Sequence, residues 1–326
     1  MSSSIDLSTI QTQINRYCIP IILSFGITGS LLNILLFSRR EFRNISCCIY
    51  FLSASVGMLI AMCFGLIPRV YSVYYPDPIN TINAFCKTRI YFGQSSALIY
   101  RWLLTMACID RYASSTTNVR IRWFANVRIA YRVVLITTMI LILFSIHNFF
   151  YRTINKDLCI LSSVGSTIYN SIYVTTLGGV IPPLIMIICA VLIRNNLRNK
   201  RERRRINAPL GNEDPSVRIL QIRDQQTLIM LFVQIIFYIL LMLPWTIFIV
   251  YSAFTSKIKS KTNNRMVIDL FIEYATETLS YAYSTLSFYL YTLTSHTFRR
   301  KLLKIIYSIL KYVNRCYTHP QRIQPN

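Results

Sequence analysis

Residues 86–112 read CKTRIYFGQSSALIYRWLLTMACIDRY, an apolar span of helix length that ends in the charged triplet Asp110-Arg111-Tyr112. The chain contains six other apolar windows of similar length. In chain order the seven windows are 17–38, 47–70, 86–109, 129–150, 167–193, 226–252 and 266–292. Each window is long enough to cross a hydrocarbon core, which takes about 20 helical residues. None has the alternating pattern of a membrane-barrel strand. The sequence predicts an all-α membrane protein, a bundle of seven transmembrane helices.

Composition supports a membrane protein over a large soluble helical protein. The 326 residues are 53% hydrophobic and only 14% charged, and 13% are aromatic, which suits a bundle with aromatic belts at its interfaces. Residues 1–16 are short and polar and contain no signal-peptide cleavage site, so the first span is expected to act as its own insertion signal.

The net charge of +23 is unevenly distributed. Residues 39–46, 111–132, 194–223 and 293–326 fall on one side of a seven-span chain, and they hold 3, 5, 9 and 7 Lys and Arg, or 24 of the 35. The side richer in Lys and Arg is normally cytoplasmic, which places the N-terminus outside the cell. The same charges would attract anionic inner-leaflet lipids. This distribution argues against a nucleic-acid partner.

The loop at 194–224 is the longest and most basic, and Pro209, Gly211 and Pro215 interrupt it. One interpretation is that helices five and six extend into the cytoplasm and meet a protein partner there. The other is a basic loop that only sets the topology. Both remain open, because one segment can do both.

Three of the nine cysteines approach the oxidising face, namely Cys18, Cys86 and Cys159. Cys86 begins the third span and Cys159 lies in the loop between spans four and five. We expect a Cys86–Cys159 disulfide that ties this loop over the mouth of the bundle. The alternative is two free thiols.

Several motifs resemble those of the rhodopsin-like (class A) G-protein-coupled receptors over about residues 17–312. Besides Asp110-Arg111-Tyr112 with Cys86 one helix length earlier, the matching residues are Gly29, Asn33, Pro182-Pro183, Pro244, Tyr291 and Phe298-Arg299-Arg300. At 1.5 Å per residue, the 25 residues from Cys86 to Arg111 cover roughly 37 Å, a tilted membrane crossing. The resemblance implies a receptor, not an enzyme, that binds an extracellular ligand and a heterotrimeric G protein at the plasma membrane.

The chain departs from the family pattern in three places, so it resembles a divergent member. Met58 stands where the family has an acidic residue in the second helix, so the usual sodium site is expected to be absent. The seventh helix reads Ser287-Phe288-Tyr289-Leu290-Tyr291, which keeps only the tyrosine of the Asn-Pro-x-x-Tyr motif and loses the proline kink. Leu241-Met242-Leu243-Pro244 lacks the tryptophan that often precedes the proline of helix six.

The residues expected to couple to a G protein lie at the cytoplasmic ends of the helices. Asp110 is expected to hold Arg111 in the quiet receptor, and an Arg111–Asp224 contact would tether helices three and six. The alternative is that Asp224 only neutralises Arg223 at the surface. Pro183 and Pro244 are expected to act as hinges, although such kinks are also common packing features. The resemblance adds Tyr112 and Tyr291 to this set.

Arg101 lies inside the third span, roughly 15 Å from Arg111 on helical geometry. A charge at that depth requires a partner and is a candidate functional site. The expected partners are His147, Gln94, Gln234 or internal water. The two interpretations are a polar network that fixes helix packing and a ligand-sensing residue.

Glu273 and Glu277 share one face of the outer half of helix seven, and Asp269 extends that face outward by a turn. They could bind a cationic ligand, or they could pair with Lys257, Lys259, Lys261 or Arg265. Helix three has Gly93-Gln94 where amine receptors have an Asp, and residues 266–292 contain no Lys for retinal. A peptide ligand, as in neuropeptide receptors, is therefore favoured, with Gln94, Arg101, Trp245, Glu273 and Glu277 as candidate binding residues.

The chain is thus expected to comprise an extracellular N-terminus (1–16), the seven-helix domain (17–292), an amphipathic helix on the inner leaflet (293–315) and a cytoplasmic tail (316–326). Cys316 is a candidate palmitoylation site. No cofactor or metal is expected, since the three histidines have no metal-ligand spacing. The rival hypotheses are a receptor-like decoy or scaffold without G-protein signalling, and a transporter or channel.

Overall fold

The computed structural model describes residues 2–155, 158–207, 215–255 and 262–294, with five further positions near the C-terminus (299, 300, 302, 303 and 307). The side chains of 2–6, 201, 204–207, 215–228 and a few other helical residues are outside this description.

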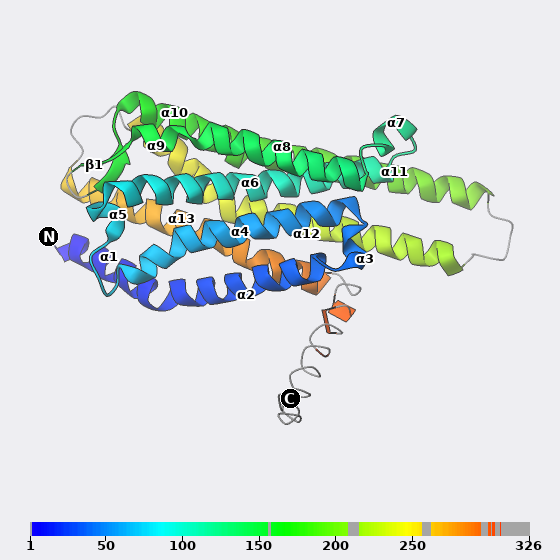
Figure 1. Ribbon diagram of the computed structural model, residues 1–326, viewed down its shortest axis with the longest axis horizontal. Coiled ribbons are helices and arrows are strands. Elements are labelled where there is room, and N and C mark those ends of the chain that lie inside the picture. The colour runs from blue at the N-terminus through cyan, green and yellow to red at the C-terminus, as the bar shows by residue number, and fades with distance from the viewer. Residues whose placement is uncertain are drawn as a thin grey trace, which may run out of the picture.

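Long helices lie side by side along the longest dimension of the molecule and form one bundle (Figure 1). In chain order the elements are α1 (Ser2–Gln13), the π-helix η1 (Ile14–Cys18), α2 (Ile19–Phe37), α3 (Arg40–Arg43), α4 (Ser46–Tyr71), α5 (Pro78–Thr81), α6 (Asn83–Ser115), α7 (Val119–Arg122), α8 (Val127–Ser145), α9 (His147–Tyr151), β1 (Arg152–Asn155), β2 (Leu158–Leu161), α10 (Val164–Val174), the π-helix η2 (Thr175–Val180), α11 (Ile181–Asn207), α12 (Pro215–Thr255) and α13 (Asn263–Thr294).

Five helical stretches of the described chain are long and apolar enough to cross a membrane, at Leu7–Phe37, Ser46–Tyr71, Val127–Tyr151, Val164–Lys200 and Phe232–Thr255. The helices α6 and α13, of 33 and 32 residues, complete the seven. These two helices are more polar than the five apolar stretches. Helix α6 carries Arg89, Arg101, Asp110 and Arg111, and helix α13 carries Asp269, Glu273 and Glu277. The predicted all-α bundle of seven helices is confirmed.

The centre of the bundle is packed around α6, which contacts α4, α8 and α11. The largest fully buried side chains include four tyrosines, Tyr50, Tyr100, Tyr238 and Tyr283. By contrast, the window at Val127–Tyr151 is only 17% buried, so most of its apolar surface faces outward, as lipid contact requires. Helix four is therefore peripheral and helix three central.

Prolines and π-helices interrupt the regular hydrogen bonding of three helices. Pro68 lies inside α4 and Pro244 inside α12. In the fifth helix η2 is followed directly by Pro182 and Pro183 at the start of α11. A proline cannot donate the backbone hydrogen bond to the preceding turn, so a carbonyl is freed at each of these positions. The seventh helix has no proline and runs without interruption from Asn263 to Thr294.

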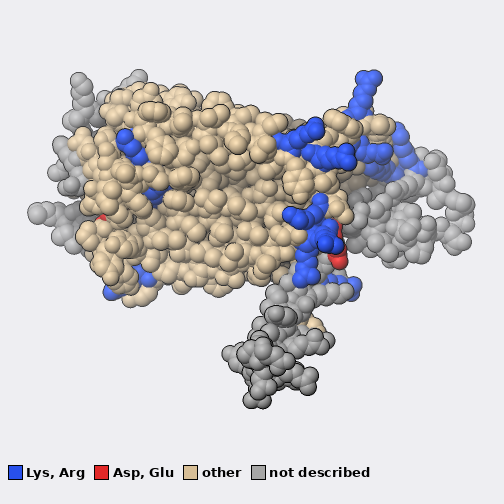
Figure 2. Space-filling view, viewed as in Figure 1, with Lys and Arg blue, Asp and Glu red and all other residues tan. Residues whose placement is uncertain are grey.

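A short hairpin covers one end of the bundle, close to the N-terminus (Figure 1). Its strands β1 and β2 pair antiparallel, with Arg152 opposite Leu161 and Ile154 opposite Cys159. The opposite end is extended by the last turns of α11 and the first turns of α12 (Figure 1). Figure 2 shows Lys and Arg side chains gathered at that end and few over the apolar middle. The molecule thus has a covered end and a basic end.

Most of the expected helix at 293–315 lies outside the described residues. Of the described positions there, Leu302 is buried, whereas Arg299, Arg300, Leu303 and Tyr307 are exposed. Cys316 also lies outside the described residues.

Candidate functional site

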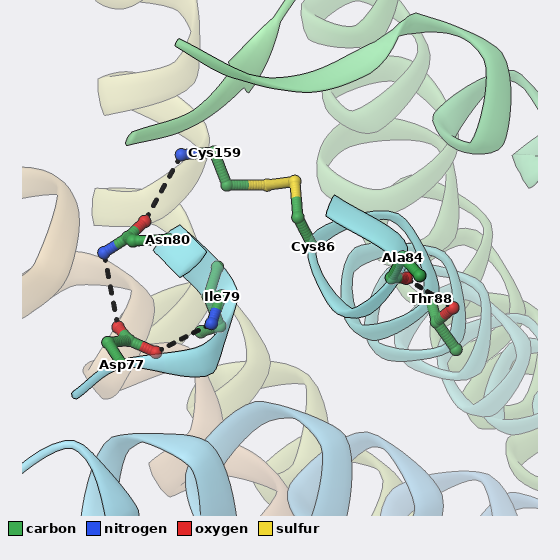
Figure 3. Close-up of a disulfide and its surroundings, with 7 residues drawn as sticks. All are labelled: Asp77, Ile79, Asn80, Ala84, Cys86, Thr88 and Cys159. Carbon is green, nitrogen blue, oxygen red and sulfur yellow. Dashed lines mark hydrogen bonds between the residues drawn. A yellow bond between two sulfur atoms is a disulfide. The ribbon is translucent and has the colours of Figure 1, made fainter. Parts of the chain in front are cut away.

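A disulfide fastens the hairpin to the start of α6 (Figure 3). Cys86 and Cys159 are bonded, with their Cα atoms 5.9 Å apart and a sequence separation of 73. The Asn80 side chain accepts a hydrogen bond from the Cys159 backbone N–H at 3.3 Å. Asp77 in turn accepts from the Ile79 N–H at 3.0 Å, which caps the short helix α5. The predicted bridge is confirmed, and it ties the hairpin over the bundle.

Glu277 on α13 is engaged by a residue that the sequence did not indicate. It forms a salt bridge with Arg69 of α4, whose side chain is only 10% exposed. Arg69 also donates to Thr278 at 2.8 Å and lies 4.9 Å from the ring centre of Tyr274. Tyr281 donates to the second carboxylate oxygen of Glu277 at 3.3 Å. The expected pairing of Glu277 with loop lysines or Arg265 is replaced by an internal pair between the second and seventh helices.

Arg89 of α6 satisfies the backbone opened by Pro68. Its Nε donates to the Phe64 carbonyl at 3.1 Å and a terminal nitrogen donates to the Gly65 carbonyl at 3.0 Å. The Phe64 carbonyl needs such a donor because Pro68, four residues later, has no N–H. Gly65 also leaves room for Tyr281, whose hydroxyl would lie 2.2 Å from an added Cβ.

Arg152 reaches from β1 toward the acids of helix seven. Burial lowers the pKa of Arg152 to about 10, while the negative charges of Glu273 and Glu277 act in the opposite direction. Its Nε is buried and has no hydrogen-bond partner among the described residues. Glu273 itself is exposed. The covered end therefore combines Arg69, Arg89 and Arg152 with two carboxylates, one of which is already paired.

The other outer candidates lie apart from these charges. Gln94 donates to the Asn170 side-chain oxygen at 3.0 Å, and His147 contacts the same oxygen at 3.1 Å. Trp245 is partly buried against the cluster of Leu98, Leu141, Tyr173, Val174 and Ile249. Gln94 thus links the third and fifth helices, while Trp245 packs on the side of helices three to five.

Arg101 is buried, with 6% exposure, and its surroundings differ from those expected. Its Cζ atom lies 5.7 Å from the ring centre of the neighbouring Tyr100. Its guanidinium lies beside Gly178 of η2, where an added Cβ would be 2.9 Å from one terminal nitrogen. The expected partners Gln94 and His147 bond to Asn170 instead, and Gln234 donates to Tyr283 at 3.4 Å. The expectation of those three partners is wrong.

At the basic end, Asp110 and Arg111 turn toward different neighbours. Asp110 is 1% exposed and accepts from the Ser46 hydroxyl at 2.8 Å. Arg111 interacts with the thiol of Cys47 on α4. Asp110 and Arg111, both within the described part of the chain, form no salt bridge with each other. Asp110 therefore interacts chiefly with the second helix rather than with its neighbour in sequence.

The remaining switch candidates are only partly visible. Tyr112 is half-buried and packs against the cluster of Cys108, Met186, Cys189, Ala190, Ile193 and Ile235. The side chains of Asp224 and Tyr291 are outside the described residues, so their contacts stay predictions. Pro183 follows η2 directly, and Pro244 is half-buried within α12. Within the described residues, no three His, Cys, Asp or Glu side chains converge on a possible metal site.

A multi-pass bundle with one disulfide-covered end and one basic end, and with Asp-Arg-Tyr at the latter, is the architecture of a seven-helix membrane receptor. Comparison with protein families agrees, because the model of the 7 transmembrane receptor (rhodopsin family) matches residues 29–291. The chain belongs to this family of signalling receptors. No curated protein matches it significantly.

Proposed function

We propose that this receptor binds an extracellular peptide and activates a heterotrimeric G protein across the plasma membrane, with its N-terminus outside the cell. The observation that carries the proposal is the difference between the two ends. One end has a tethered hairpin over charged side chains, and the other has long extensions of α11 and α12, together with Arg111 near the end of α6. A ligand and a transducer require such distinct surfaces.

The ligand surface lies under the hairpin, on the face of α13 that carries Glu273. Since Glu277 is held by Arg69, Glu273 is the carboxylate that remains for a cationic group of the peptide. Asp269 is engaged by the Tyr251 hydroxyl, which donates to it at 3.1 Å. A peptide suits this surface because the amine-binding Asp and the retinal-binding Lys are both missing from the sequence.

Signalling would use an outward movement of the cytoplasmic half of helix six, with Pro244 as its hinge and Pro183 as a second flexible point. Arg111 would then leave Cys47 and contact the G protein. The basic segments near the membrane, including the expected helix at 293–315, would bind anionic inner-leaflet lipids.

The direct test is agonist-stimulated nucleotide exchange. Cells that express the receptor are screened with a peptide library, and hits are then assayed for GTP exchange on purified G proteins. Exchange supports the proposal. Binding without exchange favours the decoy alternative, and a ligand-gated current favours a channel.

Asp224→Ala is expected to raise basal nucleotide exchange several-fold, because it would remove the proposed tether between Arg111 and helix six. The matched control is Glu202→Ala, which removes an exposed acid from the basic extension of helix five. Unchanged basal exchange in well-expressed Asp224→Ala protein would remove Asp224 from the switch.

Glu273→Gln is expected to reduce the potency of cationic peptide hits about tenfold, since it removes the carboxylate proposed to pair with the cationic group of the peptide. Asp269→Asn, one turn further out on the same face, should have a much smaller effect. Full potency in the Glu273→Gln receptor would place the ligand elsewhere.

A further inference from the structure

The guanidinium of Arg101 is a buried positive charge that forms no salt bridge with any carboxylate among the described residues. The side chain is 94% buried, and its Nε has no hydrogen-bond partner among the described residues. Arginine does not lose its proton in proteins, so the charge is permanent. A charge in the membrane interior normally pairs with an opposite charge or with backbone carbonyls.

The acids of the chain can be accounted for one by one. The chain has twelve Asp and Glu residues. Four of them lie within the seven spans or at their ends: Asp110, Asp269, Glu273 and Glu277. By sequence, the other eight lie in the loops and tails. Asp110 is nine residues from Arg101 along α6, about 13 Å by helical rise, and it bonds to Ser46. Glu277 is taken by Arg69, and Glu273 is a further turn toward the surface. None of these carboxylates forms a described hydrogen bond or salt bridge with Arg101.

Neutral groups shape the space around the guanidinium. The Tyr100 ring centre is 5.7 Å from the Arg101 Cζ atom, and Tyr238 is the second tyrosine that acts on the charge. The Tyr238 hydroxyl donates to the Gly178 carbonyl, so that carbonyl is directed to the tyrosine. Gly178 has no Cβ to obstruct the guanidinium. The fold thus makes room for the cation, but the described contacts supply dipoles and a ring face rather than a negative charge.

We propose that Arg101 holds a monovalent inorganic anion, chloride under physiological conditions, in the centre of the helix bundle. The unpartnered Nε–H would donate to the anion. The anion would neutralise a buried charge for which the described residues provide no carboxylate, and whose Nε, unlike that of Arg89, has no carbonyl acceptor either. It stabilises the packing of helices three, five and six, since Arg101, η2 and Tyr238 belong to these three helices.

The test compares the melting temperature of the purified receptor, in nanodiscs of zwitterionic lipid, in sodium chloride and in sodium gluconate at equal ionic strength. Gluconate is too large to replace a buried chloride. We expect the Tm of the wild-type receptor to fall by about 5 °C in gluconate, because a ligand that binds only the folded state raises its stability. Equal Tm values in the two salts would overturn the proposal and leave water as the partner of Arg101.

Two variants locate the effect. Arg101→Met should abolish the difference between chloride and gluconate, whereas Arg89→Met should keep it, since Arg89 lies in the same helix but bonds to carbonyls of α4. A salt difference that persists in Arg101→Met would assign it to the protein surface and refute the site. Should Arg101→Met not fold, crystals of the wild-type receptor grown in bromide decide the question. An anomalous peak beside Arg101 supports the site, and the absence of a peak there contradicts it.

Discussion

Prolines open the backbone of this receptor at two places, and at each a long side chain from another helix donates the missing hydrogen bond. Pro68 leaves the Phe64 carbonyl without its helical donor, and Arg89 supplies one at 3.1 Å. Pro182 and Pro183 cannot donate to the Gly178 carbonyl, and the Tyr238 hydroxyl does so instead. In a membrane interior a carbonyl without a donor cannot turn to water, so these side chains replace the solvent.

Tyr238→Phe is expected to lower the free energy of unfolding by about 1 kcal/mol, since it removes one buried interhelical hydrogen bond while it keeps the ring. The measurement is thermal unfolding of the purified receptor. Tyr289→Phe is the matched control, because the Tyr289 hydroxyl also donates to a helix carbonyl, that of Phe25, but at an exposed position. Equal losses in the two variants would show that the Gly178 contact has no special weight.

At the scale of the helices, polar contacts link the first and second helices to the outer half of the seventh. Arg69 joins α4 to α13 through Glu277, and Asn15 of η1 accepts from the Tyr274 hydroxyl at 2.6 Å. Tyr274 also provides the ring over which Arg69 lies. These contacts hold α13 beside the N-terminal helix at the covered end of the bundle.

Glu277→Gln is expected to destabilise the receptor by about 2 kcal/mol, because Arg69 stays buried after its carboxylate partner is removed. The measurement is a double-mutant cycle with Arg69→Met, read from thermal unfolding. The double variant should be more stable than the sum of the two single changes predicts. In the double variant no buried charge is left unpaired, because Arg69 and Glu277 are both replaced by neutral residues.

Glu273→Gln serves as the control for stability, because Glu273 is exposed and one turn from the pair. It should change the unfolding free energy by less than about 0.5 kcal/mol. Additive effects of Arg69→Met and Glu277→Gln would contradict the interpretation of this pair as a tie between helices two and seven.

For the whole molecule, the distribution of charge determines how the bundle is placed in the membrane. Lys and Arg gather at the end formed by α3, α7 and the described part of the α11 extension (Figure 2). The middle is apolar, and the windows of the five candidate spans are between 17% and 61% buried, which leaves much of that surface for lipid. A bundle of this kind has one stable depth in the bilayer and a preferred orientation.

The charge distribution predicts that an N-terminal epitope tag is accessible on intact cells and that a C-terminal tag is accessible only after permeabilisation. Antibody staining of both tagged forms checks this. Both tags on the same side of the membrane would exclude the seven-span topology, and the reverse pattern would exclude Arg111 as a cytoplasmic residue.

Much of the architecture could be predicted from local sequence. The seven spans follow from the length of apolar windows, because the bilayer requires about 20 helical residues for each crossing. The disulfide follows from the small number of cysteines on the oxidising face. The helical extensions beyond the membrane at 194–224 were one of two expectations, and α11 does continue to Asn207 while α12 begins at Pro215.

The partners of the charged residues could not be predicted in this way. Glu277 and Arg69 are 208 residues apart in sequence, and no local pattern marks Arg69 as the partner of an acid on helix seven. The partners expected for Arg101 were chosen by polarity and depth, but the rotation of each helix directed Gln94 and His147 toward Asn170. Helix rotation depends on packing with several neighbours at once.

The sequence by itself determined that this chain crosses the membrane seven times and that its basic end differs from its disulfide-bearing end, because bilayer thickness and charge act on each segment separately. Only the tertiary structure decided which charges are neutralised and which remain available. That outcome depends on distances between side chains of different helices, which bring Arg69 to Glu277, Ser46 to Asp110 and, among the described residues, no carboxylate into a salt bridge with Arg101.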